Sequence, residues 1–263
     1  MAKGFDCAQA LTQAVAERFR ADGFEFVCRY VVPSGWKRLT RQEAEAISAA
    51  GLQIVSVYET TASRALGGRR AGLLDGVAAA EAARSLGQPK GSRIYFAVDF
   101  DAAPDQMKTV VDYIRAASEV TPDYRTGVYG SAAVVEAVMS AQACSGFWQT
   151  YAWSKGRRIG GIHLYQYDNG PSGLGKPMHG INVDLDEAQG DVGWWSTNPP
   201  AVPLPAEEAG KELEVHMLAK EDANKIIGFL KAAYAAVDNA EAQDEFHRLA
   251  TELRKASGQP EEE

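Results

Sequence analysis

Acidic residues stand at the ends of several short apolar runs, and they have the clearest capacity for chemistry in this chain. Asp6 follows the opening run, Asp99 and Asp101 end RIYFAVDFD, and Asp184 and Asp186 lie within INVDLDEA. Because side chains alternate along a strand, each pair spaced by two projects to one side. Carboxyl groups crowded into one cleft cannot all ionise at neutral pH, so at least one stays protonated as an acid. Glycoside hydrolysis needs this arrangement.

A further acid, Glu59, ends the run QIVSVYE. An acid at the end of a strand also commonly caps the next helix or turn, and Asp101 is open to that interpretation. Asp6, Asp99 and Asp184 are harder to explain as caps because they lie on three separate runs. The predicted catalytic residues are therefore Asp6, Glu59, Asp99, Asp101 and Asp184.

Aromatic and amide side chains lie near the same run ends. Aromatic rings give flat apolar faces for sugars, and their hydroxyl groups orient a ligand, although many such rings simply fill a core. The predicted substrate-binding residues are Tyr129, Trp148, Tyr151, Gln166 and Asp186.

The elements that must position these residues follow an alternating pattern of apolar runs and alanine-rich helical segments, which is typical of a parallel sheet. Eight strands are predicted near residues 4–8, 26–32, 53–59, 93–100, 126–130, 146–153, 161–168 and 181–188. The last three follow one another without room for full helices. We therefore predict an α/β fold, an irregular (β/α)8 barrel of the TIM type that lacks its later helices. An open doubly wound sheet is the alternative, but GFDCAQA supplies no glycine-rich phosphate loop. In a barrel, the site lies at the C-terminal ends of the strands.

Metal and thiol chemistry have little support in the sequence. The four histidines show no ligand spacing, so no metal and no cofactor are predicted, with a carboxylate-bound divalent ion as an alternative. The three cysteines indicate small core residues, because Cys7 alternates away from Asp6 and lacks a partner histidine.

The negative charge is concentrated in the last 63 residues, and this distribution indicates which classes of partner the chain can bind. Of the net charge of −8, residues 1–200 contribute 20 basic against 21 acidic side chains, and residues 201–263 contribute 7 against 14. A near-neutral body with an acidic tail argues against nucleic acid. No stretch approaches the roughly 20 apolar residues of a membrane span, and the first residues lack a signal-type apolar region. Neither membrane insertion nor a targeting segment is expected.

Residues 199–209, PPAVPLPAEEA, are predicted to be a stiff proline-rich linker between a barrel over residues 1–198 and a helical domain over residues 210–263. Apolar residues recur at intervals of three and four in LAKEDANKIIGFLKAAYAAV and AQDEFHRLATELRKA, which indicates two amphipathic helices. A domain this small is marginal alone, so we expect it to pack on the barrel or to form a homodimer.

The ordered set GFDCA, IYFAVDFD, GVYG, WQTYAW, LYQYD and VDLDEA resembles the DUF1906 or Rv2525c-like glycoside-hydrolase-like family, which is related to the family 25 lysozymes. Family 25 enzymes are muramidases that cut the β-1,4 bonds of peptidoglycan on an irregular barrel. By position, the resemblance makes Asp6 the first-strand acid, Asp99 and Asp101 the fourth-strand pair, and Asp184 the eighth-strand acid. Where family 25 usually has Asp-x-Glu with Glu as proton donor, this chain has Asp101, one methylene shorter, so either Asp101 or Glu59 is expected to donate the proton.

The tail is similar to helical segments on endolysins of phages that infect Gram-positive bacteria. The resemblance implies a phage-type endolysin that is made in the host cytoplasm and reaches the peptidoglycan after the membrane is permeabilised. The missing fourth-strand Glu motivates an alternative, a catalytically silent barrel that binds cell-wall glycan. A structural cell-envelope protein is a third hypothesis.

Overall fold

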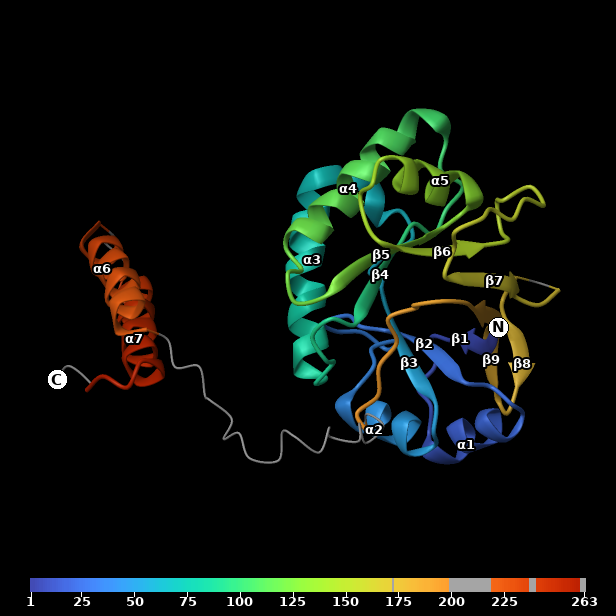
Figure 1. Ribbon diagram of the computed structural model, residues 1–263, viewed down its shortest axis with the longest axis horizontal. Helices are drawn as coiled ribbons and strands as arrows, with labels where there is room; N and C mark the ends of the chain where they lie inside the picture. Colours follow the sequence, from blue (N-terminus) through green and yellow to red (C-terminus); the bar gives the residue numbers. More distant parts are fainter. Residues whose placement is uncertain (172, 199–218, 237–239, 261–263) are drawn as a thin grey trace, which may run out of the picture. The chain divides into compact units, whose positions relative to one another are not determined.

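The computed structural model describes residues 1–171, 173–198, 219–236 and 240–260, and the chain divides into two compact units at Met1–Ala201 and Val202–Glu263 (Figure 1). The predicted linker, residues 199–209, lies outside the described residues.

The first unit is a closed barrel, as predicted. The barrel strands are β1 (Ala2–Asp6), β2 (Phe26–Tyr30), β3 (Gln53–Tyr58), β4 (Arg93–Ala97), β5 (Arg125–Gly130), β6 (Gly146–Thr150), β7 (Leu164–Asp168) and β9 (Ile181–Ala188). They follow the order β1-β2-β3-β4-β5-β6-β7-β9, and β1 pairs with β9 to close the ring. A further strand, β8 (Lys176–Met178), forms a hairpin with β9 and was not predicted from the sequence.

The direction of the last barrel strand differs from the expectation. Strands β1 to β7 pair in parallel, but β9 is antiparallel to both β7 and β1. The expectation that the C-terminal end of this strand carries acids to the rim was therefore wrong. In the observed register Asp184 lies opposite Asp6, at the rim. Asp186 lies opposite Gly4, two residues further from the rim on the same inward-facing side of the strand.

In the described part of the barrel, helices lie between the earlier strands. Three of them begin at side-chain caps, where the hydroxyl groups of Thr12, Thr40 and Ser131 accept a hydrogen bond from a backbone N–H of the first turn. Within the described ranges no helix separates β6, β7 and β9, in agreement with the predicted loss of the later helices. The helices are α1 (Gln13–Ala21), α2 (Arg41–Ala49), α3 (Gly68–Ser85), α4 (Met107–Glu119) and α5 (Ala132–Ser140), with 3-10 turns η1 (Arg64–Gly67) and η2 (Pro104–Gln106).

The interior of the barrel is filled by side chains. Phe26, Tyr95, Trp148 and their neighbours form one buried cluster, and a larger cluster lies between the strands and the helices. Gly4 is needed for this packing, because a Cβ atom there would lie 2.2 Å from the Phe26 ring. The barrel is therefore a packed core that leaves room for a site only at its ends.

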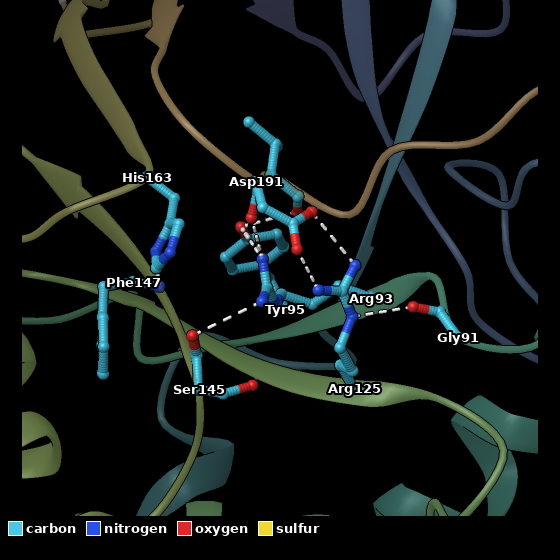
Figure 2. A network of polar contacts seen from close by, with 9 residues as sticks. Gly91, Arg93, Tyr95, Arg125, Ser145, Phe147, His163 and Asp191 are labelled. Atoms are coloured by element: carbon cyan, nitrogen blue, oxygen red, sulfur yellow. Dashed lines mark hydrogen bonds and ion pairs between the residues drawn. The ribbon is translucent and has the colours of Figure 1, made fainter.

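A polar network closes the end of the barrel at which the parallel strands begin (Figure 2). Arg125 pairs with the Asp191 carboxylate and donates to the Gly91 carbonyl at 2.7 Å, and Arg93 donates to the Asp191 carbonyl at 2.6 Å. A cavity of about 640 Å³ opens at this end between Arg125, Asp191 and Trp194, and none of the predicted site residues lines it. We interpret this end as structural, because chemistry in such barrels belongs to the opposite rim.

The second unit contains α6 (Lys220–Ala236) and α7 (Ala240–Ala256), which pack against each other where the periodicity predicts two helices. Ala223, Ile227 and Ala250 are buried, while Phe229 is 75% exposed. None of the helices within the described ranges combines the length and the apolar character that a membrane span requires.

Candidate active site

Four of the predicted acids line one cavity of about 90 Å³ at the rim where the parallel strands end. Asp6 is the last residue of β1, Glu59 and Asp99 follow β3 and β4, and Asp184 lies on β9. The parallel strands bring their carboxyl ends to one edge, and the register of β9 brings Asp184 level with Asp6. The rest of the lining is Tyr30, Val57, Ala97, Tyr129, Trp148 and Gln166.

Gln166 on β7 connects the acids of the first and last strands. Its Nε2 donates to Asp6 Oδ2 at 2.7 Å and to Asp184 Oδ2 at 3.1 Å. Its Oε1 accepts hydrogen bonds from the Tyr129 hydroxyl at 3.0 Å and from Thr150 Oγ1 at 2.6 Å. Because two hydroxyl donors fix the amide oxygen, the amide nitrogen must face the two carboxyl groups.

The acids differ in protonation because they differ in burial and in their neighbours. Burial raises the pKa of Asp6 to about 6, although the hydrogen bond from Gln166 opposes the rise. Burial, with repulsion from Asp6 and Asp99, raises the pKa of Asp184 to about 8. The pKa of Asp99 is also raised, by burial and then by the charge of Glu59. At neutral pH Asp184 is therefore largely protonated beside an ionised Asp6, the split in acidity that acid and base roles require.

A lysine that the sequence analysis missed reaches the same cavity wall. Lys37 Nζ lies 3.2 Å from Glu59 Oε2 and 4.3 Å from the centre of the Tyr30 ring. Lys37 lies in the loop after β2, where periodicity gives no guide to position. Its ammonium group partly neutralises the acidic rim and keeps Glu59 in an ion pair.

A second cavity of about 480 Å³ adjoins the first, because Asp6, Tyr30 and Asp184 line both. Two exposed apolar side chains also line it, Trp36 at 75% and Leu174 at 76% exposure. The acids therefore stand between a narrow pocket and a wider one with an aromatic wall, a combination suited to a sugar. Trp36 was not among the predicted residues, since a lone tryptophan in a loop gives no pattern.

The remaining predicted residues lie away from the cavity surface or beneath it. Asp101 is exposed and does not line the 90 Å³ cavity, and neither does Tyr151, whose hydroxyl bonds Asn169. Asp186 is 0% exposed, so its prediction as a substrate-binding residue was wrong: the antiparallel strand carries it down into the core. Trp148 is 2% exposed, so it forms part of the cavity floor and presents no open ring face to a sugar.

No metal centre is evident in the part of the chain that the structure describes, where no three His, Cys, Asp or Glu side chains are grouped to hold an ion. The thiols of Cys7, Cys28 and Cys144 are unpaired, and burial raises the pKa of each. A buried thiol of raised pKa is a poor nucleophile. The thiols therefore add no nucleophile to the carboxyl groups of this rim.

Comparison with known proteins finds relatives across the barrel. The uncharacterized protein YbfG of Bacillus subtilis (strain 168) is 30% identical over 237 residues, which cover 77% of this chain and 31% of YbfG. The chain thus spans about a third of the length of that relative. The crystal structure of the Tat-secreted protein Rv2525c of Mycobacterium tuberculosis, in complex with L-tartrate, is 27% identical with a TM-score of 0.66, over 74% of this chain and 99% of that chain.

A more distant likeness shows the fold alone. The modular autolysin LytC from Streptococcus pneumoniae, in complex with a synthetic peptidoglycan ligand, has a TM-score of 0.50 at 11% identity, over 70% of this chain and 46% of that chain.

The family described as Rv2525c-like, glycoside hydrolase-like domain matches residues 17–188, which is more than half of the sequence. The closed barrel, its acidic rim and this match agree, and the chain belongs to the Rv2525c-like, glycoside hydrolase-like family.

Proposed function

We propose that the barrel hydrolyses the β-1,4-linked glycan strands of peptidoglycan, in the manner of a muramidase. The observation that carries the proposal is the convergence of Asp6, Glu59, Asp99 and Asp184 on one cavity. The raised pKa of Asp184, which burial and the neighbouring Asp6 cause, supports its role as the proton source. Peptidoglycan is the chosen substrate because the motifs resemble those of family 25 muramidases.

The proposed reaction uses the acids in two roles. The Asp184 carboxyl group gives its proton to the glycosidic oxygen as the bond from that oxygen to the sugar C1 breaks. The carboxylates of Asp6 and Asp99 stabilise the positive charge that develops at C1. A water molecule then adds to C1 and returns a proton to the Asp184 carboxylate. Asp184 replaces Asp101 and Glu59 as the proposed donor, because Asp101 lies outside the cavity and Glu59 is paired with Lys37.

The test is release of reducing ends from purified Gram-positive peptidoglycan by the full chain and by Asp99→Asn, Asp184→Asn, Glu59→Gln and Asp101→Asn. We expect Asp99→Asn and Asp184→Asn to lower the rate by roughly 10²- to 10⁴-fold, as for loss of an acid or base group. Glu59→Gln lowers it less, and Asp101→Asn leaves it within about threefold. A rate that falls with Asp101→Asn alone would contradict the assignment of Asp184.

A catalytically silent glycan-binding barrel is the second candidate, and the position of Asp101 favours it. The resemblance assigns proton donation to the place that Asp101 occupies, yet this side chain is exposed and outside the cavity. If the folded chain binds glycan strands but releases no reducing ends at any pH between about 4 and 8, spanning the pKa values of Asp6 and Asp184, the barrel is a binding module.

The finer role we propose is that of a phage-type endolysin, whose second unit binds the Gram-positive wall or joins two copies of the chain. Exposed apolar side chains on α6, with Phe229 the most exposed, support a contact surface there. Such an enzyme, made in the host cytoplasm, would lyse permeabilised Gram-positive cells but not intact ones. Sedimentation of the full chain and of Phe229→Glu tests for the homodimer, and pelleting of each with cell walls tests for wall binding.

A further inference from the structure

An acid that the proposed reaction does not use lies directly beneath the site. The side chain of Asp186 is 0% exposed. Trp148 Nε1 donates to its Oδ1 at 2.9 Å, and its Oδ2 receives no N–H or O–H donor from the residues that the structure describes. An ionised carboxylate this deep in a core, with a single donor, would be very costly.

The neighbour of Asp186 explains how the cost is avoided. Asp186 lies on β9 one inward-facing position below Asp184, which is paired with Asp6, and this brings the carboxyl groups of Asp186 and Asp6 within hydrogen-bonding reach of each other. Two carboxylate oxygens repel each other, so one of the two groups must carry a proton. Asp6 lines both rim cavities and also accepts a hydrogen bond from Gln166, whereas Asp186 is closed off from both cavities. The negative charge therefore belongs on Asp6 and the proton on Asp186 Oδ2.

We propose that Asp186 is a positioning residue: it remains a neutral carboxylic acid and donates a hydrogen bond to Asp6, which holds the Asp6 carboxylate ionised and turned toward the cavity. Asp6 then has two buried donors, Asp186 from below and Gln166 from the side, and it keeps its open face for a ligand.

The surroundings of the pair favour this placement of the proton. Burial, and then the charge of Asp6, raises the pKa of Asp186 well above its usual value. Among the described residues, no lysine, arginine or histidine forms an ion pair with Asp186, and the ammonium group of Lys37 pairs with Glu59. The titratable and charged groups around the pair are Cys7, Cys28, Tyr30, Lys37, Glu59, Asp99, Tyr129, Tyr167 and Asp184.

The proton on Asp186 belongs to the resting protein, so its presence does not depend on the proposed hydrolysis and is tested without substrate. A protonated carboxyl group has an infrared carbonyl band that an ionised one lacks. Because Asp184 also carries a proton at neutral pH, the full chain is compared with Asp184→Asn, Asp186→Asn and the double variant. At about pH 7.5, well above the usual carboxyl range, we expect the band of Asp184→Asn to be stronger than that of the double variant, because the other carboxyl groups are the same in both. An Asp184→Asn band no stronger than that of the double variant overturns the proposal.

The positioning role has its own measurement, the titration of the labelled Asp6 carboxyl carbon by NMR. Asparagine at position 186 can still donate to Asp6 and accept from Trp148, so Asp186→Asn should titrate near the native midpoint. Asp186→Leu removes the donor, so the midpoint should move to higher pH. An unchanged midpoint in Asp186→Leu overturns the role. If Asp186→Leu does not fold, a midpoint for Asp186→Asn far from the native value overturns it instead. A chain that shows the band but releases no reducing ends contradicts only the proposed hydrolysis.

Discussion

Arg29 on β2 and Glu43 on α2 form a buried ion pair beneath the loop that follows Asp6. The guanidinium group donates through Nε at 2.7 Å and through Nη2 at 3.1 Å to the two carboxylate oxygens, and the two side chains are 0% and 4% exposed. The pair also holds the loop, because Arg29 Nη1 donates to the Cys7 carbonyl at 2.7 Å and Glu43 Oε1 accepts from the Leu11 backbone at 3.0 Å. Asp6 is thereby fixed from its C-terminal side.

Removal of one partner from this ion pair should destabilise the barrel strongly. Glu43→Leu leaves the Arg29 charge buried without compensation, so we expect the free energy of unfolding to fall by roughly 3–5 kcal/mol. Urea unfolding followed by tryptophan fluorescence reports on the barrel, since all five tryptophans lie within it. The matched control is Glu45→Leu on the same helix, whose pair with Arg41 is exposed and is worth at most about 1 kcal/mol. Equal losses in the two variants would show that the buried pair has no special role.

Replacement of Gln166 by methionine tests the amide that joins Asp6 to Asp184. The change keeps the size of the side chain but removes both donors and the acceptor, so the free energy of unfolding should fall by about 1.5–3 kcal/mol at neutral pH. The loss should shrink in acid, because the hydrogen bond favours the ionised form of Asp6. The exposed Gln13→Met is the control, with an effect within about 0.5 kcal/mol. A loss that does not vary with pH would contradict the electrostatic role.

The raised pKa values of Asp6 and Asp184 predict a particular pH dependence of stability. In the folded chain the pKa is about 6 for Asp6 and about 8 for Asp184, whereas the usual value of an aspartate, taken for the unfolded chain, is 3.8. Both carboxyl groups therefore hold their protons more tightly in the folded chain. The folded state therefore binds more protons between these values, and this contribution to stability is lost as the pH rises from about 4 to 8. Asp184→Asn should raise the Tm near pH 8 and change it little near pH 4.

The contribution of Asp191 to stability should depend on pH in the opposite way. Its hydrogen bonds with Arg125 lower its pKa in the folded chain, so its contribution is present at neutral pH and is lost in acid. Asp191→Asn should therefore lower the Tm near pH 8 while Asp184→Asn raises it. If both variants lower the Tm near pH 8, the acids of the rim do not oppose folding.

The close packing of α3 on α4 depends on a residue without a side chain. A Cβ atom at Gly72 would lie 2.1 Å from the Tyr113 carbonyl oxygen, so Gly72→Ala should cost about 1–3 kcal/mol of unfolding free energy despite the better helix propensity of alanine. Gly160→Ala is the control, since a Cβ atom there meets nothing within 4 Å. Both variants are compared by urea unfolding, and a neutral Gly72→Ala would mean that the two helices can move apart freely.

The fold and four of the acids were predictable because both depend on local patterns. Strand runs ending in Asp6, Glu59 and Asp99 predict the rim, since parallel strands end at one edge. The direction of β9 was not predictable, because the alternation of apolar and polar residues reads the same along either direction of a strand. This ambiguity leads directly to the error at Asp186, whose depth depends on strand direction. Lys37 and Trp36 were missed because a loop position depends on tertiary contacts.

The closure of the ring between β1 and β9 has a consequence for folding kinetics. Asp6 meets Gln166 across 160 residues of chain, so the carboxyl cluster cannot exist until the last strands dock on the first. Such non-local contacts form slowly, since the entropy of closing the long loop is lost before any contact compensates for it. Docking also brings the acids of the rim together, so their mutual repulsion opposes the final step. The proposed catalytic residues therefore slow the last step of folding. Mildly acidic conditions, which protonate these acids, should make that step faster.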